Sequence, residues 1–489
     1  MRRCAHLPTL LSLLLGLAVA GCQFQWDDLG ADLPTVGAPL PKSAMTKLNS
    51  APASRSTFVY DRSERPYVVF NEPVQTDAGP GLGLRVQRLI GEALDYYVLA
   101  AEVYISTYAF FVLTKEDAGG GPDNTATRLN VLEVGDLDGA RNFLVPNGPA
   151  LLFPSDDDRV MFYIVQDADV TEYDLLRLDG TFRRKIPLPS GVEPIDPLSG
   201  MTFFFTGEGD AQRLVLRDAD KNVTLYSTTT VAEVALGKMA GVIWSQASLE
   251  RVFVCGADGL FAMSFDGKTK TVFDARPCAT DFTQLGLTDE HIYYGVDQKL
   301  YRIPVAEGGT PELLDPSPRR LLHITVDGDG GEHILLSSDP SSRYSNGAGT
   351  GFVGNWQFME RGRAARYKRD LSRVFWIEHA ALPSGAGDLL TATVPGGNPL
   401  RLLRNVRKYT ELDDGRLLAT ANVAFRGVQN RVVLVDTERR EQRWVAEAAT
   451  DFQLIPGTSD VILDVIAGPE SIDIYRATLP APAVDGGAP

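Results

Sequence analysis

The sequence predicts an all-β fold made of repeated four-stranded antiparallel sheets. Two observations predict it. Between residues 57 and 480 the chain consists of short runs rich in Val, Leu, Ile, Phe and Tyr, separated by turns of Asp, Gly, Asn and Pro, which is typical of strands. One pattern of strand, turn and strand also recurs along this region. Only residues 84–101 could be either a helix or the start of a strand.

The recurring hairpins start about 40 to 46 residues apart over most of the region. A clear copy is "YDLLRLDGTFRRKIPL", and most copies follow another β-rich run such as "RVMFYIV". The hairpins occupy residues 127–145, 173–188, 212–227, 259–274, 298–314, 387–403, 430–445 and 471–479. A four-stranded unit of this size cannot bury both faces alone, so such units stack around an axis as the blades of a β-propeller. We expect a single propeller of eight blades, with seven or nine as alternatives, because the gap before residue 387 has room for a degenerate unit.

The ends of the repeat region set the expected domain boundaries. The last unit stops near residue 479 without an obvious fourth strand. A strand within residues 57–72 could supply it and close the ring, which would remove the exposed edges of the first and last blades. We therefore expect the propeller to span residues 57–480, followed by a disordered tail at 481–489.

The first 21 residues have the layout of an export signal. Arg2 and Arg3 precede an apolar run from Leu10 to Ala20, which is too short to span a bilayer. Residues 19–22, "VAGC", resemble the lipobox of bacterial lipoproteins. That resemblance implies cleavage between Gly21 and Cys22 and a diacylglycerol on the Cys22 thiol. An ordinary signal peptide cut before a cysteine is the alternative.

Residues 22–56 are rich in Pro, Ala, Ser and Gly and show no sustained apolar period. We expect a flexible tether with a root-mean-square reach of about 30 Å. By the same resemblance, Gln23 stands where many inner-membrane lipoproteins have aspartate, which favours the outer membrane of a Gram-negative cell, facing the periplasm or the cell surface. The net charge of -16 argues against nucleic acid as a partner, and we expect a monomer.

Cys255 and Cys278 are the two cysteines that remain after the signal and the lipid site are assigned. An even pair in an exported protein favours a disulfide, because the envelope is oxidising. Strand alternation puts both at the same face of one blade. The second and fourth strands of a blade lie roughly 9.6 Å apart, so the chain leaving the fourth strand would have to curl back. Two reduced buried thiols are the alternative.

No motif for catalysis or metal binding stands out. The nearest approach to G-x-S-x-G is "RYSNG", residues 343–347, which lacks the first glycine. The Asp-rich turns "DADKN" (218–222) and "DGDGGE" (327–332) fail the pattern of a calcium loop. We therefore expect no catalytic residue, no cofactor and no metal site, with calcium as the alternative.

The histidines of the mature chain are scarce. They are His291, His323, His333 and His379. None belongs to a pair with the spacing of metal ligands, so we expect strand or turn positions for all of them. His323 and His333 flank the turn at 327–332, but ten residues apart across a hairpin they need not meet.

One basic segment departs from the acidic composition. "RGRAARYKRD", residues 361–370, carries five basic side chains, namely Arg361, Arg363, Arg366, Lys368 and Arg369. The segment could contact phosphate, lipopolysaccharide or an acidic partner. The alternative is a solvated loop that is neutralised in part by its own neighbours.

Residues 153–180, "FPSDDDRVMFYIVQDADVTEYDLLRLDG", resemble the repeat of TolB-type and WD40-like periplasmic propellers. Asp156 and Asp157 stand where that family usually has Asp-Gly, and the resemblance covers most of residues 100–480 at the level of repeats. It implies a non-catalytic binding or scaffold protein for another envelope protein, a polymer or a small ligand. The alternative is a propeller hydrolase or lactonase-like enzyme with a metal or polar site in the axial channel, because channel residues come from many blades and leave no local motif.

Overall fold

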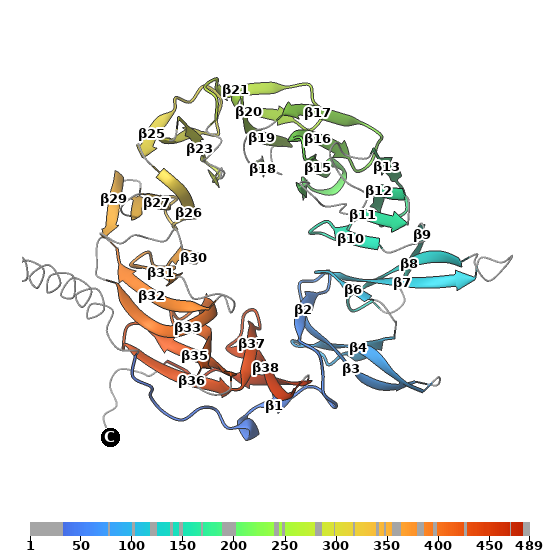
Figure 1. Cartoon of the computed structure of the whole chain (residues 1–489), viewed down its shortest axis with the longest axis vertical. Coiled ribbons are helices and arrows are strands. Elements are labelled where there is room, and N and C mark those ends of the chain that lie inside the picture. The colour runs from blue at the N-terminus through green and yellow to red at the C-terminus, as the bar shows by residue number, and fades with distance from the viewer. Residues whose placement is uncertain are drawn as a thin grey trace, which may run out of the picture. The chain divides into compact units, whose positions relative to one another are not determined.

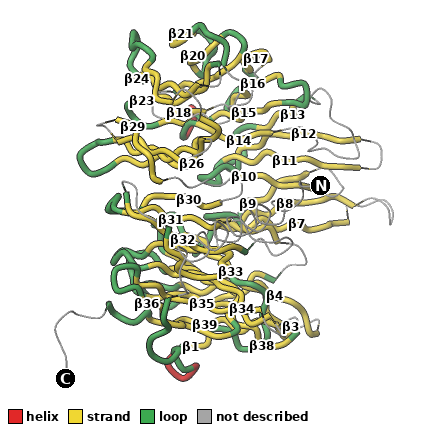
Figure 2. The backbone as a smooth tube through the Cα atoms, turned by 60° about the vertical axis from the view of Figure 1, so that its left-hand side comes forward, coloured by secondary structure: helices red, strands yellow, loops and turns green. Residues whose placement is uncertain are grey.

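The computed structural model describes residues 33–482 except 77–78, 100–102, 118–124, 137–139, 146–149, 168–169, 188–201, 239–243, 247–249, 279–285, 298, 316–317, 339–341, 347–348, 355–362, 379–385, 395–398, 425–427 and 470. Regular structure in these residues is β except for two 3₁₀ turns, η1 (Lys42–Ala44) and η2 (Gly209–Ala211), as Figure 2 shows. The expected all-β class with four-stranded antiparallel blades is confirmed. The chain divides into two compact units, unit 1 (Met1–Thr46, Pro318–Phe452, Ala477–Pro489) and unit 2 (Lys47–Ser317, Gln453–Arg476), and each is described by itself.

Unit 2 contains six consecutive four-stranded sheets in which each strand pairs antiparallel with the next along the chain. Their strands are β2 (Thr57–Tyr60), β3 (Pro66–Thr76), β4 (Gly79–Arg88), β5 (Asp95–Val98); β6 (Val103–Ile105), β7 (Ala109–Asp117), β8 (Thr125–Glu133), β9 (Arg141–Val145); β10 (Ala150–Pro154), β11 (Val160–Asp167), β12 (Val170–Arg177), β13 (Arg183–Ile186); β14 (Thr202–Thr206), β15 (Arg213–Arg217), β16 (Asn222–Ser227), β17 (Glu233–Lys238); β18 (Trp244–Gln246), β19 (Arg251–Gly256), β20 (Gly259–Ser264), β21 (Lys270–Asp274); β22 (Gly286–Leu287), β23 (His291–Val296), β24 (Lys299–Pro304) and β25 (Glu312–Asp315). Residues 84–101, open between helix and strand, therefore contribute to strands β4 and β5.

The C-terminal sheet is completed by an N-terminal strand, but a different one from that expected. Its order is β1 (Thr46–Lys47), β39 (Ser471–Thr478), β38 (Asp460–Gly468) and β37 (Ala449–Leu454). The expectation that residues 57–72 supply this strand is wrong. Those residues form β2 and β3, because their alternating apolar side chains are matched by β4 and β5 in a complete sheet of their own.

Neighbouring sheets of unit 2 pack face to face, and the strand labels in Figure 1 follow these sheets in chain order. Successive side chains of a strand point to opposite faces. On β7, Phe110 therefore joins the core shared with the β2–β5 sheet, and Phe111 joins the core shared with the β10–β13 sheet. Both rings are fully buried. Each sheet thus has two apolar faces, as a propeller blade requires.

Unit 1 contains a four-stranded and a seven-stranded sheet. Their strands are β26 (Pro318–Val326), β27 (Glu332–Ser338), β28 (Ser342–Asn346), β29 (Gly349–Gly354); β30 (Arg363–Tyr367), β31 (Arg373–Glu378), β32 (Gly387–Thr393), β33 (Leu400–Glu411), β34 (Leu417–Ala424), β35 (Val428–Asp436) and β36 (Glu441–Glu447). The first part of β33 pairs with β32 and the second part with β34, so two blade-type meanders share one strand. The described residues contain nine sheets, a number that the sequence left open beside the favoured eight, and residues 57–98 form one of them.

Residues 33–56, here called the N-terminal strap, are bonded to the folded units. In unit 1 the Val36 amide donates to the Gln442 carbonyl at 2.8 Å, beside the bridge between Thr35 and Gln442. In unit 2 the Leu48 amide donates to the Ile474 carbonyl at 2.8 Å. The expectation of a flexible tether at 22–56 is therefore corrected for residues 33–56, since long-range backbone hydrogen bonds hold them. Within the described residues, no helix has the length and hydropathy needed to cross a membrane.

Candidate functional site

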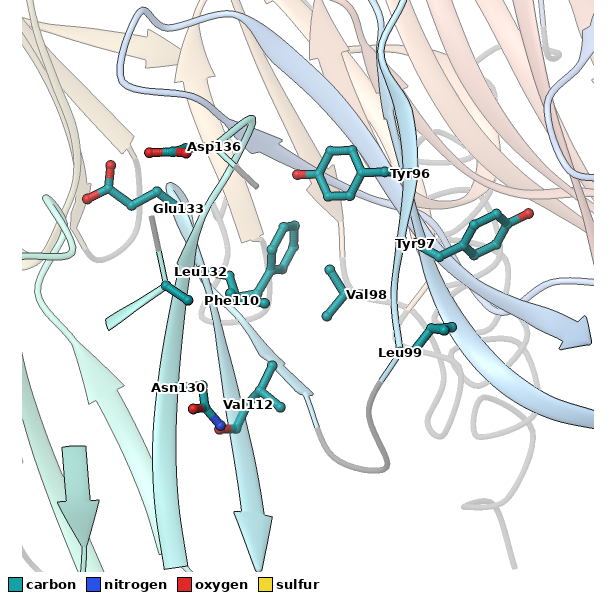
Figure 3. A pocket seen from close by; sticks show the side chains of 11 residues that line it. Tyr96, Tyr97, Val98, Leu99, Phe110, Val112, Asn130, Leu132, Glu133 and Asp136 are labelled. Carbon is teal, nitrogen blue, oxygen red and sulfur yellow. The ribbon is translucent and has the colours of Figure 1, made fainter. Parts of the chain in front are cut away.

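A pocket of about 340 Å³ opens between the β2–β5 sheet and the β6–β9 sheet of unit 2 (Figure 3). Its size lies within the range of small-molecule sites. The lining is mostly apolar and aromatic with a few polar groups, and comprises Tyr96, Tyr97, Val98, Leu99, Phe110, Val112, Asn130, Leu132, Glu133, Asp136 and Ala140. We call it the β5–β8 pocket.

One wall of the pocket is a single face of the β7–β8 hairpin. Phe110 pairs with Leu132, and Val112 pairs with Asn130. Because strand side chains alternate, these four residues share the face that looks toward β5. Asn130 thus occupies a position that the pattern would otherwise fill with an apolar residue.

The opposite wall comes from β5 and the residue after it. The Tyr96 hydroxyl accepts a hydrogen bond from the Gly135 amide at 3.1 Å, and burial raises the pKa of Tyr96, which keeps the phenol neutral. The Tyr97 side chain is directed away from Phe110 (Figure 3), and its hydroxyl donates to Glu72 Oε1 at 2.6 Å. Gly83 leaves room for this wall, since a Cβ there would lie 3.1 Å from side-chain atoms of both Tyr97 and Leu99.

Acceptor groups lie at two ends of the pocket. Glu133 and Asp136 lie together at one end, with Tyr96 extending toward them, and Asn130 lies at the other (Figure 3). The Asn130 amide nitrogen donates to Thr114 Oγ1 at 3.0 Å, which fixes the side chain and leaves its carbonyl oxygen as an acceptor.

Two arginines form ion pairs with Glu133. The nearest nitrogen of Arg141 is 3.4 Å from Glu133 Oε1, and that of Arg62 is 3.6 Å away. Both guanidinium groups have shorter bonds elsewhere, Arg141 to the Leu178 carbonyl at 3.1 Å and Arg62 to the Asp157 carbonyl at 2.5 Å. Glu133 nevertheless has two guanidinium groups within ion-pair distance, and both offset its charge at this half-exposed site.

A second, shallower hollow of about 570 Å³ lies at the β18–β21 and β22–β25 sheets. It is lined by Arg251, Asp289, Glu290, His291, Pro304, Val305 and Ala306. Its floor is held by backbone bonds. The Val305 amide donates to the Glu290 carbonyl at 2.8 Å, and Arg251 donates to the Val305 carbonyl at 3.3 Å. Glu290, Val305 and Arg251 thus use these groups to hold the turns of the fold together.

The histidines at 323 and 333 come closer together than the sequence required. Both rings contact Tyr367, with centroid distances of 6.3 Å for His323 and 6.1 Å for His333. His333 Nε2 lies 2.8 Å from Asp327 Oδ2, and burial, with the nearby Arg366, lowers the pKa of His323. His379 lies outside the described residues.

The Asp-rich turns use their carboxylates to close hairpins. Asp327 accepts the amides of Asp329 and Gly331 at 3.0 and 2.7 Å, and Asp218 accepts the amide of Asn222 at 2.8 Å. Within the part of the chain that the structure describes, no group of three or more His, Cys, Asp or Glu side chains is placed to hold a metal ion. Residues 343–346 of the "RYSNG" segment lie on strand β28, whereas a hydrolase nucleophile stands at a strand-to-helix turn, and Gly347 lies outside the described residues.

The basic segment is a strand and its turn, and its described charges are engaged inside unit 1. Arg366 lies over the Tyr409 ring with Cζ 4.3 Å from the centroid and donates to the Tyr409 carbonyl. Lys368 pairs with Asp370 at 2.7 Å and Glu438 at 3.0 Å, and Arg369 pairs with Asp413 at 2.9 Å. Arg361 and the Arg363 side chain lie outside the described residues. Each of the three described side chains thus has a partner within the fold, as the alternative of a partly self-neutralised segment expects, and the contact patch stays a prediction.

Cys255 and Cys278 form a disulfide, with a Cα–Cα distance of 5.6 Å. Cys255 lies on β19 and Cys278 follows β21. The Cys278 amide donates to the Gly256 carbonyl at 3.0 Å, so the chain does curl back from the fourth strand toward the second. Both cysteines are buried in the core between two sheets. Gly21 and Cys22 lie outside the described residues.

Comparison with solved structures finds matches of low sequence identity and low TM-score. No protein-family model matches the chain, and no curated protein matches it. A tricorn protease structure has 10% identity over 87% of this chain with a TM-score of 0.32, and this chain spans only 52% of it. The dihydro-heme d1 dehydrogenase NirN has 13% identity over 66% of this chain and 71% of its own, with a TM-score of 0.35. A streptogramin B lyase has 12% identity over 56% of this chain and 91% of its own, with a TM-score of 0.31.

Proposed function

We propose that the protein is a non-catalytic binding propeller of the bacterial envelope, anchored by a lipid on Cys22, which recognises a partner or ligand at the β5–β8 pocket. The pocket is the observation that carries the proposal. Lipid anchoring and the outer membrane rest on the lipobox-like sequence at residues 19–22.

The pocket is preformed, which favours recognition. Phe110 and Val112 in its wall are 0% and 5% exposed and belong to the core between the two sheets. A wall that is fixed by packing does not have to be ordered when a ligand binds, so less conformational entropy is lost. The polar groups at its ends supply directional hydrogen bonding, which orients a bound group.

Exposed apolar side chains extend from the pocket rim. Leu99 is 57% exposed and Tyr97 is 39% exposed. Clustered exposed apolar residues beside a pocket are typical of binding surfaces. The arrangement fits a partner that inserts one group into the pocket and covers its rim.

Site-specific crosslinking in native envelopes tests the proposal. A photoreactive phenylalanine analogue replaces Leu99 in the full chain, and the matched control carries it at Val231, which is 77% exposed on the same unit. We expect a discrete crosslinked product from position 99 alone, and its loss when the exposed Asp136 is also changed to Lys. Equal products from both positions, or a product insensitive to Asp136→Lys, would contradict recognition at this pocket.

A further inference from the structure

We infer that an extended peptide segment of a partner pairs with the outer edge of strand β5 and places one large, uncharged apolar side chain in the β5–β8 pocket. The inference rests on the proposed function, because it specifies the ligand of the same pocket. The hydrogen-bond phase of β5, the two faces of that strand and the lining of the pocket support it.

Strand β5 offers backbone hydrogen-bonding groups at its outer edge. It is the last strand of its sheet and pairs with β4 on one side. The Arg88 amide donates to the Leu94 carbonyl at 2.9 Å, so these two residues form a hydrogen-bonded pair. Such pairs alternate along an antiparallel ladder, and the register continues without a bulge. The N–H and C=O groups of Asp95 and Tyr97 therefore point away from β4, and they bond to no other backbone group of the described residues.

The two faces of β5 both present apolar side chains beside that edge. Tyr96 and Val98 are directed toward Phe110 and the pocket, whereas Tyr97 and Leu99 lie on the other side of the strand (Figure 3). The side chains of a strand added at the edge alternate between the same two faces. One side chain would thus meet the pocket, while its two neighbours would cover the exposed surface of Tyr97 and Leu99.

The pocket itself favours an uncharged apolar side chain. Val98, Phe110 and Leu132 supply aliphatic and aromatic walls. An enclosed cavity of about 150 Å³ with such walls accepts benzene, and the pocket volume here is about 340 Å³. The charge of Glu133 at one end is offset by its two arginine partners. The apolar walls therefore set the preference, and a phenylalanine side chain fits them.

Antiparallel pairing defines which backbone groups of the peptide contribute. We take this direction because the sheet itself is antiparallel and because parallel pairing is slightly less stable. The peptide residue that enters the pocket lies opposite Tyr96, so its own N–H points away from β5. Its two neighbours lie opposite Asp95 and Tyr97 and exchange hydrogen bonds with them. In this mode of recognition the main chain supplies affinity and the pocket supplies specificity.

A set of N-methylated peptides tests the inference by calorimetric titration of the full mature chain. The parent probe is acetyl-Ser-Thr-Val-Phe-Val-Thr-Ser-amide. N-methylation of either valine nitrogen should weaken binding roughly fivefold, because it removes a hydrogen-bond donor to β5. N-methylation of the phenylalanine nitrogen is the matched control and should change the affinity less than twofold. Equal effects at all three nitrogens, or no effect at either valine, would overturn the inference.

Side-chain changes in the peptide and in the protein locate the pocket residue. Replacing the phenylalanine of the probe by alanine should weaken binding roughly tenfold. Ala140→Trp fills the pocket from an exposed position in its lining and should lower the affinity of the parent probe to that of the alanine probe. Ala275→Trp, at an exposed position elsewhere in unit 2, is the matched control and should leave binding unchanged. Thermal unfolding of both variants establishes that the fold is retained.

The outcomes separate this inference from the proposed function. If the parent probe does not bind while the Leu99 crosslink persists, the inference of strand addition is wrong and recognition at the pocket stands. If the probe fails and the crosslink is also absent, both are wrong. A parent probe that binds Ala140→Trp as tightly as the wild type would also overturn the inference.

Discussion

Asp158 is a buried carboxylate whose replacement by asparagine should stabilise the protein at neutral pH. The residue is 3% exposed. The Ser106 hydroxyl donates to Oδ1, and the Tyr108 amide donates to Oδ2 at 2.6 Å. Burial outweighs these two bonds and raises the pKa of Asp158 to about 6. Its backbone has a positive φ of 51°, a conformation that asparagine also tolerates.

The raised pKa fixes the direction of the pH dependence. The folded protein holds this proton more tightly than the unfolded chain, whose pKa is close to 3.8. The stability contributed by protonated Asp158 is therefore complete below about pH 4 and is lost as the pH rises to about 6. A shift of about two pH units corresponds to about 3 kcal/mol. Above pH 6 the folded state contains a buried charge without that contribution.

Asparagine keeps both hydrogen bonds without the charge. Its carbonyl oxygen can accept the Tyr108 amide, and its amide nitrogen can donate to Ser106, since a hydroxyl both donates and accepts. Loss of the charge-assisted bonds and of the attraction to Arg62 offsets part of the gain. We expect Asp158→Asn to raise the free energy of unfolding by about 1–2 kcal/mol at pH 7.5.

Urea unfolding followed by circular dichroism between pH 4.5 and 7.5 measures the effect. The advantage of Asp158→Asn should shrink by about 2 kcal/mol between pH 6.5 and 4.5, because only the wild type takes up the proton. Asp156→Asn is the matched control, since Asp156 is exposed in the same turn. A difference from wild type that stays constant with pH, or a loss of stability at pH 7.5, would refute the reasoning.

Three further predictions concern the strap, the disulfide and the anchor. Glu72→Gln should lower the free energy of unfolding by about 3 kcal/mol, because buried Glu72 accepts a hydrogen bond from the Ser50 amide and forms an ion pair with Arg85 of β4. Unchanged hydrogen exchange at the Ser50 amide would contradict this prediction. Cys278→Ser should lower the free energy of unfolding by about 3 kcal/mol, as expected for opening a loop of 23 residues. Because this variant has no disulfide left to reduce, a reductant should not change its thermal unfolding, whereas it should destabilise the wild type. Cys22→Ser should release the protein from membranes, and a mature wild-type N-terminus whose mass lacks diacylglycerol would rule out the anchor.

The repeat pattern predicted the blades because blade strands obey a local rule. The hairpin expected at 212–227 corresponds to β15 and β16, whose apolar side chains alternate between two buried faces. That alternation can be recognised from consecutive residues of the sequence. The number of sheets was less accessible, because residues 57–98 lie before the recognisable repeats and yet form a complete sheet.

The N-terminal strap was misjudged because its order comes from distant partners. Its Pro, Ala, Ser and Gly content is typical of a tether. The strap is nevertheless held by contacts such as that of the Ser56 amide with Asp464, 3.1 Å apart and 408 residues away in sequence. Composition contains no information on such partners.

The β5–β8 pocket was missed although five of its lining residues lie in the hairpin that the sequence identified at 127–145. Asn130 and Leu132 fall in the same phase of β8, and a polar residue in that phase is the one local signal of a site. The pocket itself depends on how far β5 lies from the β7–β8 hairpin. That separation is set by the packing of two whole sheets, which no short segment specifies.

The N-terminal strap also imposes an order of events during biosynthesis. Asn49 Oδ1 accepts the amide of Ile474 at 2.8 Å, across 425 residues of sequence. Since β1 pairs with β39, the C-terminal sheet cannot be completed until nearly the whole chain has been made. Contacts of such long range are slow to form, because a large loop must close first. Until then β1 has no partner strand, so the growing chain depends on something else to keep the strap from neighbouring polypeptides.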